Sequence, residues 1–153
     1  MNTIILIASF SFMEFLAWFA HKYVMHTFGW SLHRDHHFKE PDQTFELNDL
    51  YFLIFAAPGI SFLFFGYHNG SYDPLFWVGA GISLYGMAYV FVHDIFIHQR
   101  LKILTRTQNT YLLAMRKAHK IHHKHLQKEH GECFGFLWVP PKYLKEAHLK
   151  KRS

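Results

Sequence analysis

Three long apolar runs constrain the fold of this chain more than any other feature of its sequence. They cover residues 3–20, 50–67 and 75–92, and each has 18 residues. At about 1.5 Å per residue, a helix of that length spans roughly 27 Å, close to the hydrocarbon thickness of a bilayer. Glu14 is the one charged residue within the runs. A domain of 153 residues could not cover three helices that are apolar on every side, so the sequence predicts an all-α integral membrane protein with three or four transmembrane helices.

The positive charges indicate how these spans are oriented. Of the 16 Lys and Arg residues, three fall in residues 22–49, none in 68–74, and the other thirteen from Arg100 onward. By the positive-inside rule we expect the amino terminus outside, and residues 21–49 and 93–153 as a cytoplasmic cap. We expect one membrane-embedded domain over residues 1–153, whose net charge of +5 faces lipid headgroups rather than nucleic acid.

Histidine is the outlier of the composition, with 14 residues in 153. Ten of them form two HxxxxH pairs and two HxxHH triplets: His21, His26, His33, His36, His37, His93, His98, His119, His122 and His123. The pairs end the first and third runs and the triplets lie in the expected cap, so all four motifs reach one membrane face. Ten imidazoles suit two metal ions with four or five ligands each, and the single Cys133 excludes a thiolate-rich site.

The motif spacings predict where the imidazoles point. In a triplet, the i, i+3, i+4 spacing places three side chains within an arc of about 100°, so each triplet can converge on one site. Side chains five residues apart diverge by about 140° on a regular helix. The pairs therefore suit either a π-type distortion or ligands that serve two separate metals, and we favour the two metals.

Three carboxylates accompany the motifs. Asp35 and Asp94 lie inside them, where each can accept a hydrogen bond from a ligating histidine. Glu14 precedes His21 by seven residues, about two helical turns, and a carboxylate in an apolar span tends to face the bundle interior. We expect the three carboxylates to orient ligands or to carry protons.

Two features of the carboxy-terminal part leave alternatives open. His125 and His130 fit neither spacing and are accessory ligands, groups that hydrogen-bond to ligands or, as we favour, solvated residues of a basic helix. An aromatic segment suits a membrane interface or a core-packing loop equally well: Phe134, Phe136, Leu137, Trp138 and Tyr143, around Pro140 and Pro141.

The order of the motifs, with two stretches between them, resembles the bacterial β-carotene 3-hydroxylases of the fatty acid hydroxylase superfamily. The stretches are Phe-Glu-Leu-Asn-Asp at 45–49 and Gly-Met-Ala-Tyr-Val-Phe-Val-His-Asp at 86–94. The resemblance covers nearly the whole chain. The histidine order alone would identify only the superfamily, whose other members hydroxylate or desaturate lipids and sterols.

The resemblance implies a non-haem di-iron monooxygenase. It would use O₂ to hydroxylate C3 of each β-ionone ring of β-carotene, giving β-cryptoxanthin and then zeaxanthin, with 4-keto carotenoids such as canthaxanthin as further substrates. It also implies a ferredoxin-type electron donor and a place in the bacterial cytoplasmic membrane. Two iron ions would occupy the histidine sites, although zinc or another metal can replace them in a purified sample.

Two alternatives remain at this point. A fatty acid or sterol hydroxylase of the same superfamily would differ only in substrate. A non-catalytic membrane metal-binding or transport protein would belong to another class, but transport favours polar ligands near the middle of the bilayer, and these motifs lie at helix ends and in loops.

Overall fold

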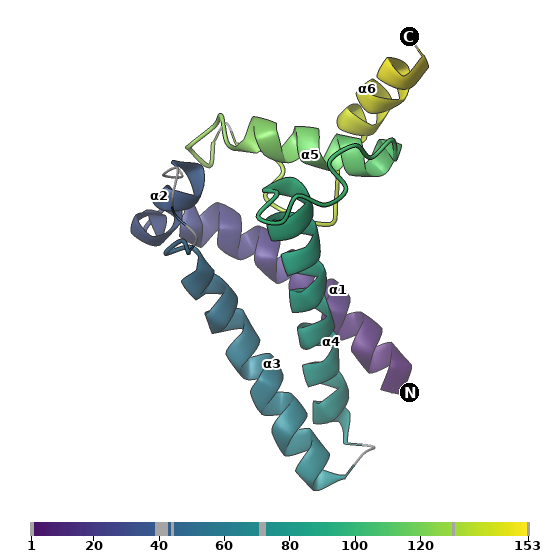
Figure 1. Cartoon of the computed structure of the whole chain (residues 1–153). Helices are drawn as coiled ribbons and strands as arrows, with labels where there is room; N and C mark the ends of the chain where they lie inside the picture. The colour runs from purple at the N-terminus through teal and green to yellow at the C-terminus, as the bar shows by residue number, and fades with distance from the viewer. Residues whose placement is uncertain (1, 39–42, 44, 71–72, 130, 153) are drawn as a thin grey trace. The chain divides into compact units, whose positions relative to one another are not determined.

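The computed structural model describes residues 2–38, 43, 45–70, 73–129 and 131–152 (Figure 1). Its helices, with η marking π-helix, are α1 (Asn2–Ala20), η1 (His21–Met25), α2 (Trp30–His37), α3 (Asp49–Asn69), α4 (Pro74–Tyr89), η2 (Val90–Ile97), α5 (Thr110–His122) and α6 (Pro141–Arg152). The described residues contain no strand. The chain divides into two compact units, Met1–Leu16 with Trp30–Ala88 and Ala17–Gly29 with Tyr89–Ser153. The single domain stays a prediction.

Three helices are long and apolar enough to cross a membrane: Asn2–Met25, Asp49–Asn69 and Pro74–Ile97. Each contains one of the predicted runs and extends it by a few residues. Large apolar side chains on them are exposed, among them Ile4 at 71% and Ile60 at 63%. Such surfaces are costly in water and suit contact with lipid. The prediction of an all-α membrane protein is confirmed.

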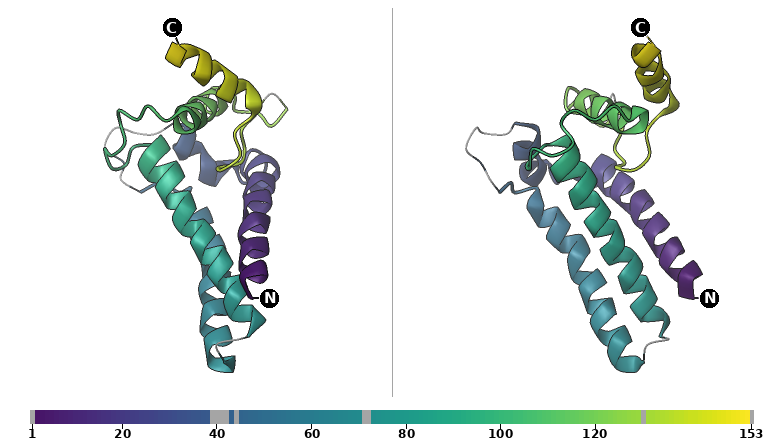
Figure 2. Two further views of the ribbon diagram at one scale, coloured as in Figure 1. Left: turned by 90° about the vertical axis from the view of Figure 1, so that its right-hand side faces the viewer. Right: turned by 45° about the vertical axis from the view of Figure 1, so that its right-hand side comes forward.

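Close helix contacts hold the first unit together. In both views of Figure 2, as in Figure 1, α3 and α4 run side by side in opposite directions. A Cβ atom added at Gly79 would lie 2.5 Å from the main-chain nitrogen of Leu63 on α3, and one at Gly81 would lie 2.6 Å from the carbonyl oxygen of Leu6 on α1. Small residues are needed at these positions because helices in lipid associate by close packing.

The second unit has a buried core that begins at the last residues of the Pro74–Ile97 helix. The core residues come from η2, α5, α6 and the segment that precedes α6: Phe96, Ile97, Ala114, Met115, Ala118, Val139 and Tyr143. The side chain of Asn109 caps α5 by accepting a hydrogen bond from the N–H of Leu112 at 3.1 Å. This core fixes α5, which carries the second triplet.

Candidate metal centre

Both HxxxxH pairs lie in or beside π-helical segments. The N–H of His26 donates to the carbonyl of His21 at 3.1 Å, and the N–H of His98 donates to that of His93 at 2.9 Å. The wider π-turn brings residues five apart onto one side of the helix, so the ring centroids are 5.0 Å apart in the first pair and 4.6 Å in the second. Our expectation that the members of a pair diverge to two metals is therefore wrong, and the π-type distortion is what the structure contains.

We call His21, His26 and His122 the His21 group. Each has a ring nitrogen within 4.8 Å of one on each of the others, and Nε2 of His26 lies 3.1 Å from Nε2 of His122. The three rings donate Nδ1–H to main-chain carbonyls of one loop, His21 to Phe134 at 2.9 Å, His26 to Leu126 at 2.9 Å and His122 to Glu132 at 3.0 Å. The loop thereby fixes the orientation of all three rings.

We call His93, His98 and His119 the His93 group. Their ring nitrogens also lie within 4.8 Å of one another. Nε2 of His119 is 2.8 Å from Nε2 of His98 and 2.8 Å from Nε2 of His123. Nδ1 of His93 donates to the Asp94 carboxylate at 2.7 Å. His123 therefore adjoins this group.

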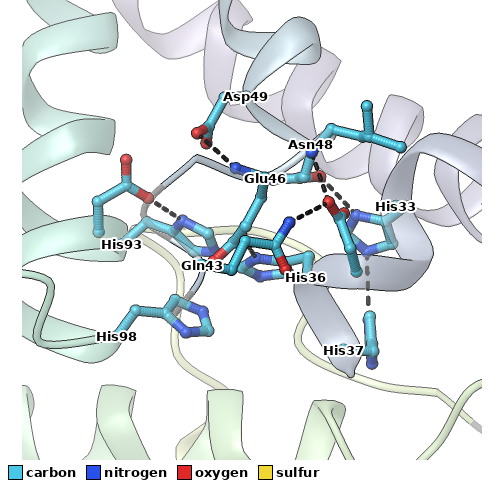
Figure 3. A network of polar contacts seen from close by, with 12 residues as sticks. His33, His36, His37, Gln43, Glu46, Asn48, Asp49, His93 and His98 are labelled. Atoms are coloured by element: carbon cyan, nitrogen blue, oxygen red, sulfur yellow. Dashed lines mark hydrogen bonds and ion pairs between the residues drawn. The ribbon is translucent and has the colours of Figure 1, made fainter. Parts of the chain in front are cut away.

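The first triplet lies on α2 in the other unit. Nδ1 of His33 donates to Oδ1 of Asn48 at 2.6 Å, and Nδ1 of His36 donates to Oε2 of Glu46 at 2.7 Å (Figure 3). Nε2 of His37 lies 3.2 Å from Nε2 of His33. Asn48 and Glu46 are both buried, so water does not compete for these hydrogen bonds.

One rule governs six of these histidines: Nδ1 faces a carbonyl or carboxylate oxygen. These oxygens only accept, so Nδ1 carries the proton and Nε2 keeps its lone pair. The close Nε2 pairs are 2.8 to 3.2 Å apart. In the His26–His122 pair both rings donate Nδ1–H, so two lone pairs face each other at 3.1 Å and repel unless a cation lies between them. Imidazoles bound at right angles to one ion, each at about 2.1 Å, have their nitrogens about 3.0 Å apart. The donor set is compatible with metal binding.

The electrostatics of the second unit favour neutral imidazole, the form that binds metal. Burial, with further contributions from His93, His98, His122 and His123, lowers the pKa of His119 well below its ordinary value. Burial also lowers the pKa of His26, against a smaller opposite effect of its hydrogen bond to the Leu126 carbonyl. Burial raises the pKa of the Cys133 thiol to about 12, which keeps it from acting as a thiolate ligand.

The second triplet does not converge on one site, as we had expected of each triplet. His119 belongs to the His93 group and His122 to the His21 group, and their ring centroids are 5.6 Å apart. The reason is tertiary, because the two π-helical pairs approach α5 at different turns. The triplet therefore supplies both groups.

Phe136 lies between the two groups of the second unit. Its ring stacks on His21 with centroids 5.6 Å apart and meets His93 edge to face at 5.0 Å. Phe134, Phe136 and Tyr143 are buried, whereas Trp138 is 74% exposed. Of the two interpretations of the aromatic segment, core packing holds for the three buried rings, Phe134 and Phe136 in the loop and Tyr143 on α6.

The predicted carboxylates have different surroundings. Asp94 accepts from His93, as described above. Asp35 accepts from the main-chain N–H of Leu47 at 2.5 Å and the Gln43 amide at 2.9 Å, so it holds the loop that follows the first triplet. Glu14 accepts from the hydroxyl of Tyr85 at 2.8 Å. His125 is exposed, and His130 lies outside the described residues.

Sequence reasoning missed several partners of the ligands. Glu46 and Asn48 lie in the 45–49 stretch that carried the family resemblance, so their position was noticed but not their role. The carbonyls of Leu126, Glu132 and Phe134 have no side-chain signature, and no pattern could have found them.

The chain is similar in sequence to several known proteins. The family model described as "Fatty acid hydroxylase" matches residues 6–139. The chain is 41% identical over 152 residues to "Beta-carotene hydroxylase" of Pantoea ananas, covering 99% of this chain and 85% of that protein. It is 36% identical over 151 residues to the protein of the same name from Pseudescherichia vulneris, covering 99% and 84%. It is also 41% identical over 137 residues to "Beta-carotene 3-hydroxylase, chloroplastic" of an Oncidium hybrid cultivar, covering 88% and 44%. No solved structure matches the chain.

Proposed function

The chain belongs to the fatty acid hydroxylase family, and from that premise we propose that it hydroxylates C3 of the β-ionone rings of β-carotene, giving β-cryptoxanthin and then zeaxanthin. As a member of a hydroxylase family it is an enzyme. Similarity over almost its whole length to proteins named β-carotene hydroxylases supports the carotenoid substrate. The name of the Oncidium relative supports position 3.

The observation that carries the proposal is the arrangement of the ring nitrogens. Six motif histidines donate Nδ1–H to an acceptor, and Nε2 atoms face one another at 2.8 to 3.2 Å. We propose that all ten motif histidines are ligands of two iron ions: His21, His26, His33, His36, His37, His93, His98, His119, His122 and His123. Bound iron would supply O₂ activation, which no amino-acid side chain performs unaided.

The reaction needs O₂ and two electrons besides the carotenoid. One oxygen atom enters the C–H bond at C3, the other leaves as water, and two protons are taken up. We propose a ferredoxin-type protein as the electron donor, since the thirteen Lys and Arg residues from Arg100 onward would attract an acidic partner. Anionic lipid would explain the same charges. The discriminating measurement is ferredoxin binding at low and at raised salt, where binding that weakens as salt is added supports the ferredoxin partner.

The chain's own residues have three tasks in this proposal. The apolar helices keep a hydrophobic substrate in the membrane, and the acceptors of the Nδ1–H groups hold the imidazoles in one tautomer. We propose that three carboxylates orient ligands or carry protons: Glu14, Asp35 and Asp94. The first of them accepts a hydrogen bond from the hydroxyl of Tyr85. The active site would lie on the cytoplasmic face of a bacterial membrane with the amino terminus outside. Reporter fusions at each terminus and within residues 68–74 would test this orientation.

Expression in β-carotene-producing bacteria tests the function. We expect zeaxanthin by chromatography, with β-cryptoxanthin as the intermediate. The His122→Ala variant is the matched control and should lose both the product and bound iron. If the wild-type chain holds iron yet makes no hydroxylated carotenoid, the carotenoid assignment is wrong.

The same cells decide between the alternatives. Hydroxylated fatty acids or sterols in place of zeaxanthin would identify another hydroxylase of the family. Feeding canthaxanthin tests the proposed activity on 4-keto rings, for which hydroxylated keto-carotenoids are the expected products.

A further inference from the structure

We propose that the described residues of the 126–134 loop form a clamp that sets the geometry of the His21 group, and that Glu132 positions this clamp by tying it to α6. This inference rests on the proposed metal centre. It assigns a positioning role to residues outside the four histidine motifs, some of them more than a hundred residues from the first pair.

The clamp contacts every member of the His21 group twice. Each Nδ1–H is accepted by a loop carbonyl at 2.9 to 3.0 Å. The ring of Phe134 also meets the imidazoles of His21, His26 and His122 edge to face, with centroids 5.4, 5.2 and 5.0 Å apart. One loop thus determines both the tautomer and the tilt of three rings that come from two separate helices.

The backbone of the clamp depends on an unusual conformation. Cys133 lies between the two acceptor residues Glu132 and Phe134 and has a φ of 61°. The left-handed region is unfavourable for a residue with a side chain, most of all for a β-branched one, and glycine adopts it freely. Surrounding contacts must therefore hold Cys133 in place. A Cβ at Gly131 would lie 2.5 Å from the ring of Phe134, so the loop is also closely packed.

The side chain of Glu132, next to Cys133, makes two polar contacts with α6. Its Oε1 accepts from the hydroxyl of Tyr143 at 2.5 Å, and its Oε2 lies 2.5 Å from Nζ of Lys142. Tyr143 is only 3% exposed and packs in the core of the second unit with Met115 of α5. Glu132 therefore joins the rigid core through its carboxylate and His122 through its carbonyl.

Metal release measures this role without relying on activity. The full-length protein, purified in detergent and loaded with Fe²⁺, is mixed with a chelator, and the metal remaining per chain is followed in time. We expect two slowly released ions in the wild type. In Glu132→Ala and Tyr143→Phe, we expect one of the two to leave about tenfold faster or more, with the other unchanged.

Two matched comparisons separate the clamp from general destabilisation. Cys133→Gly should keep wild-type release, whereas Cys133→Val should release one ion as fast as Glu132→Ala. Glu146→Gln removes the exposed ion pair with Lys117, which also joins α5 to α6, and should release both ions at the wild-type rate.

The outcomes distinguish this inference from the proposed function. A wild-type chain that binds no metal overturns the metal centre and the clamp together. Two bound ions with unchanged release in Glu132→Ala overturn the clamp alone. Equal acceleration of both ions in Glu132→Ala also overturns it, because the hydrogen bonds and ring contacts that define the clamp are made to the His21 group.

Discussion

Replacing Glu46 with Ala tests how a buried acceptor controls a metal ligand. Oε2 of Glu46 accepts the Nδ1–H of His36 at 2.7 Å, and both side chains are only 1% exposed, so water cannot take over this role. A hydrogen bond to a charged group contributes about 1.5–3 kcal/mol. Loss of such a partner weakens metal binding by about 10- to 100-fold, or about 1.4–2.7 kcal/mol. We expect that loss of iron affinity in a chelator competition with the purified protein, and a parallel fall in hydroxylation.

Two variants control this experiment. Glu46→Gln keeps an acceptor oxygen but not the charge, so its affinity should fall between those of the wild type and Glu46→Ala. Glu146 is an exposed carboxylate on α6 that lies 2.5 Å from Nζ of Lys117, and Glu146→Gln should bind iron normally. Wild-type iron affinity in Glu46→Ala, alongside weakened binding in His36→Ala, would refute the idea that Glu46 holds the ligand in place.

Three further predictions concern other parts of the site. Phe136→Ala removes a buried ring that contacts both groups of the second unit, so it should lower the free energy of unfolding by about 3–5 kcal/mol and speed the release of both metals. Phe136→Leu should have a smaller effect on both quantities. A thermal midpoint of Phe136→Ala equal to that of the wild type would contradict this prediction. Glu14→Gln keeps a partner for Tyr85 but removes the charge, so product formation should fall more than bound iron, and unchanged turnover would remove Glu14 from the mechanism. Because the pKa of His119 is lowered in the fold, the native metal-free chain binds fewer protons than the unfolded chain, whose histidines titrate near about 6.5. The thermal midpoint of the metal-free protein should therefore fall as the pH drops below about 6.5. A midpoint that rises over this range would refute the burial of His119 in its neutral form.

The sequence by itself determined the class of protein, the spans and the ligand residues proposed for the metals. Runs of 18 apolar residues are long enough to cross a bilayer, and the helices Asn2–Met25, Asp49–Asn69 and Pro74–Ile97 contain them. A membrane-spanning helix satisfies its own backbone hydrogen bonds, so its location depends on local composition and needs no tertiary information. The spacing of the histidine motifs is also a local property, so the proposed ligand residues could be identified without tertiary information.

Tertiary structure decided how the histidines are grouped. The i, i+5 spacing of His21 and His26 allowed two conformations, and only the π-helical backbone places both rings in one group. The spacing of His119 and His122 suggested a shared site, yet packing assigns them to different groups. Helical spacing specifies which side chains are neighbours on one helix but not which partners meet them from another.

Tertiary structure also decided what holds the ligands. His21 donates to the carbonyl of Phe134, 113 residues away, and any residue type offers the same carbonyl. The sequence therefore carries no trace of the 126–134 clamp, whereas the carboxylate of Glu46 at least stands in a recognisable stretch. Side-chain chemistry can be read along a chain, but the direction of a main-chain carbonyl depends on backbone conformation, which the surrounding packing imposes.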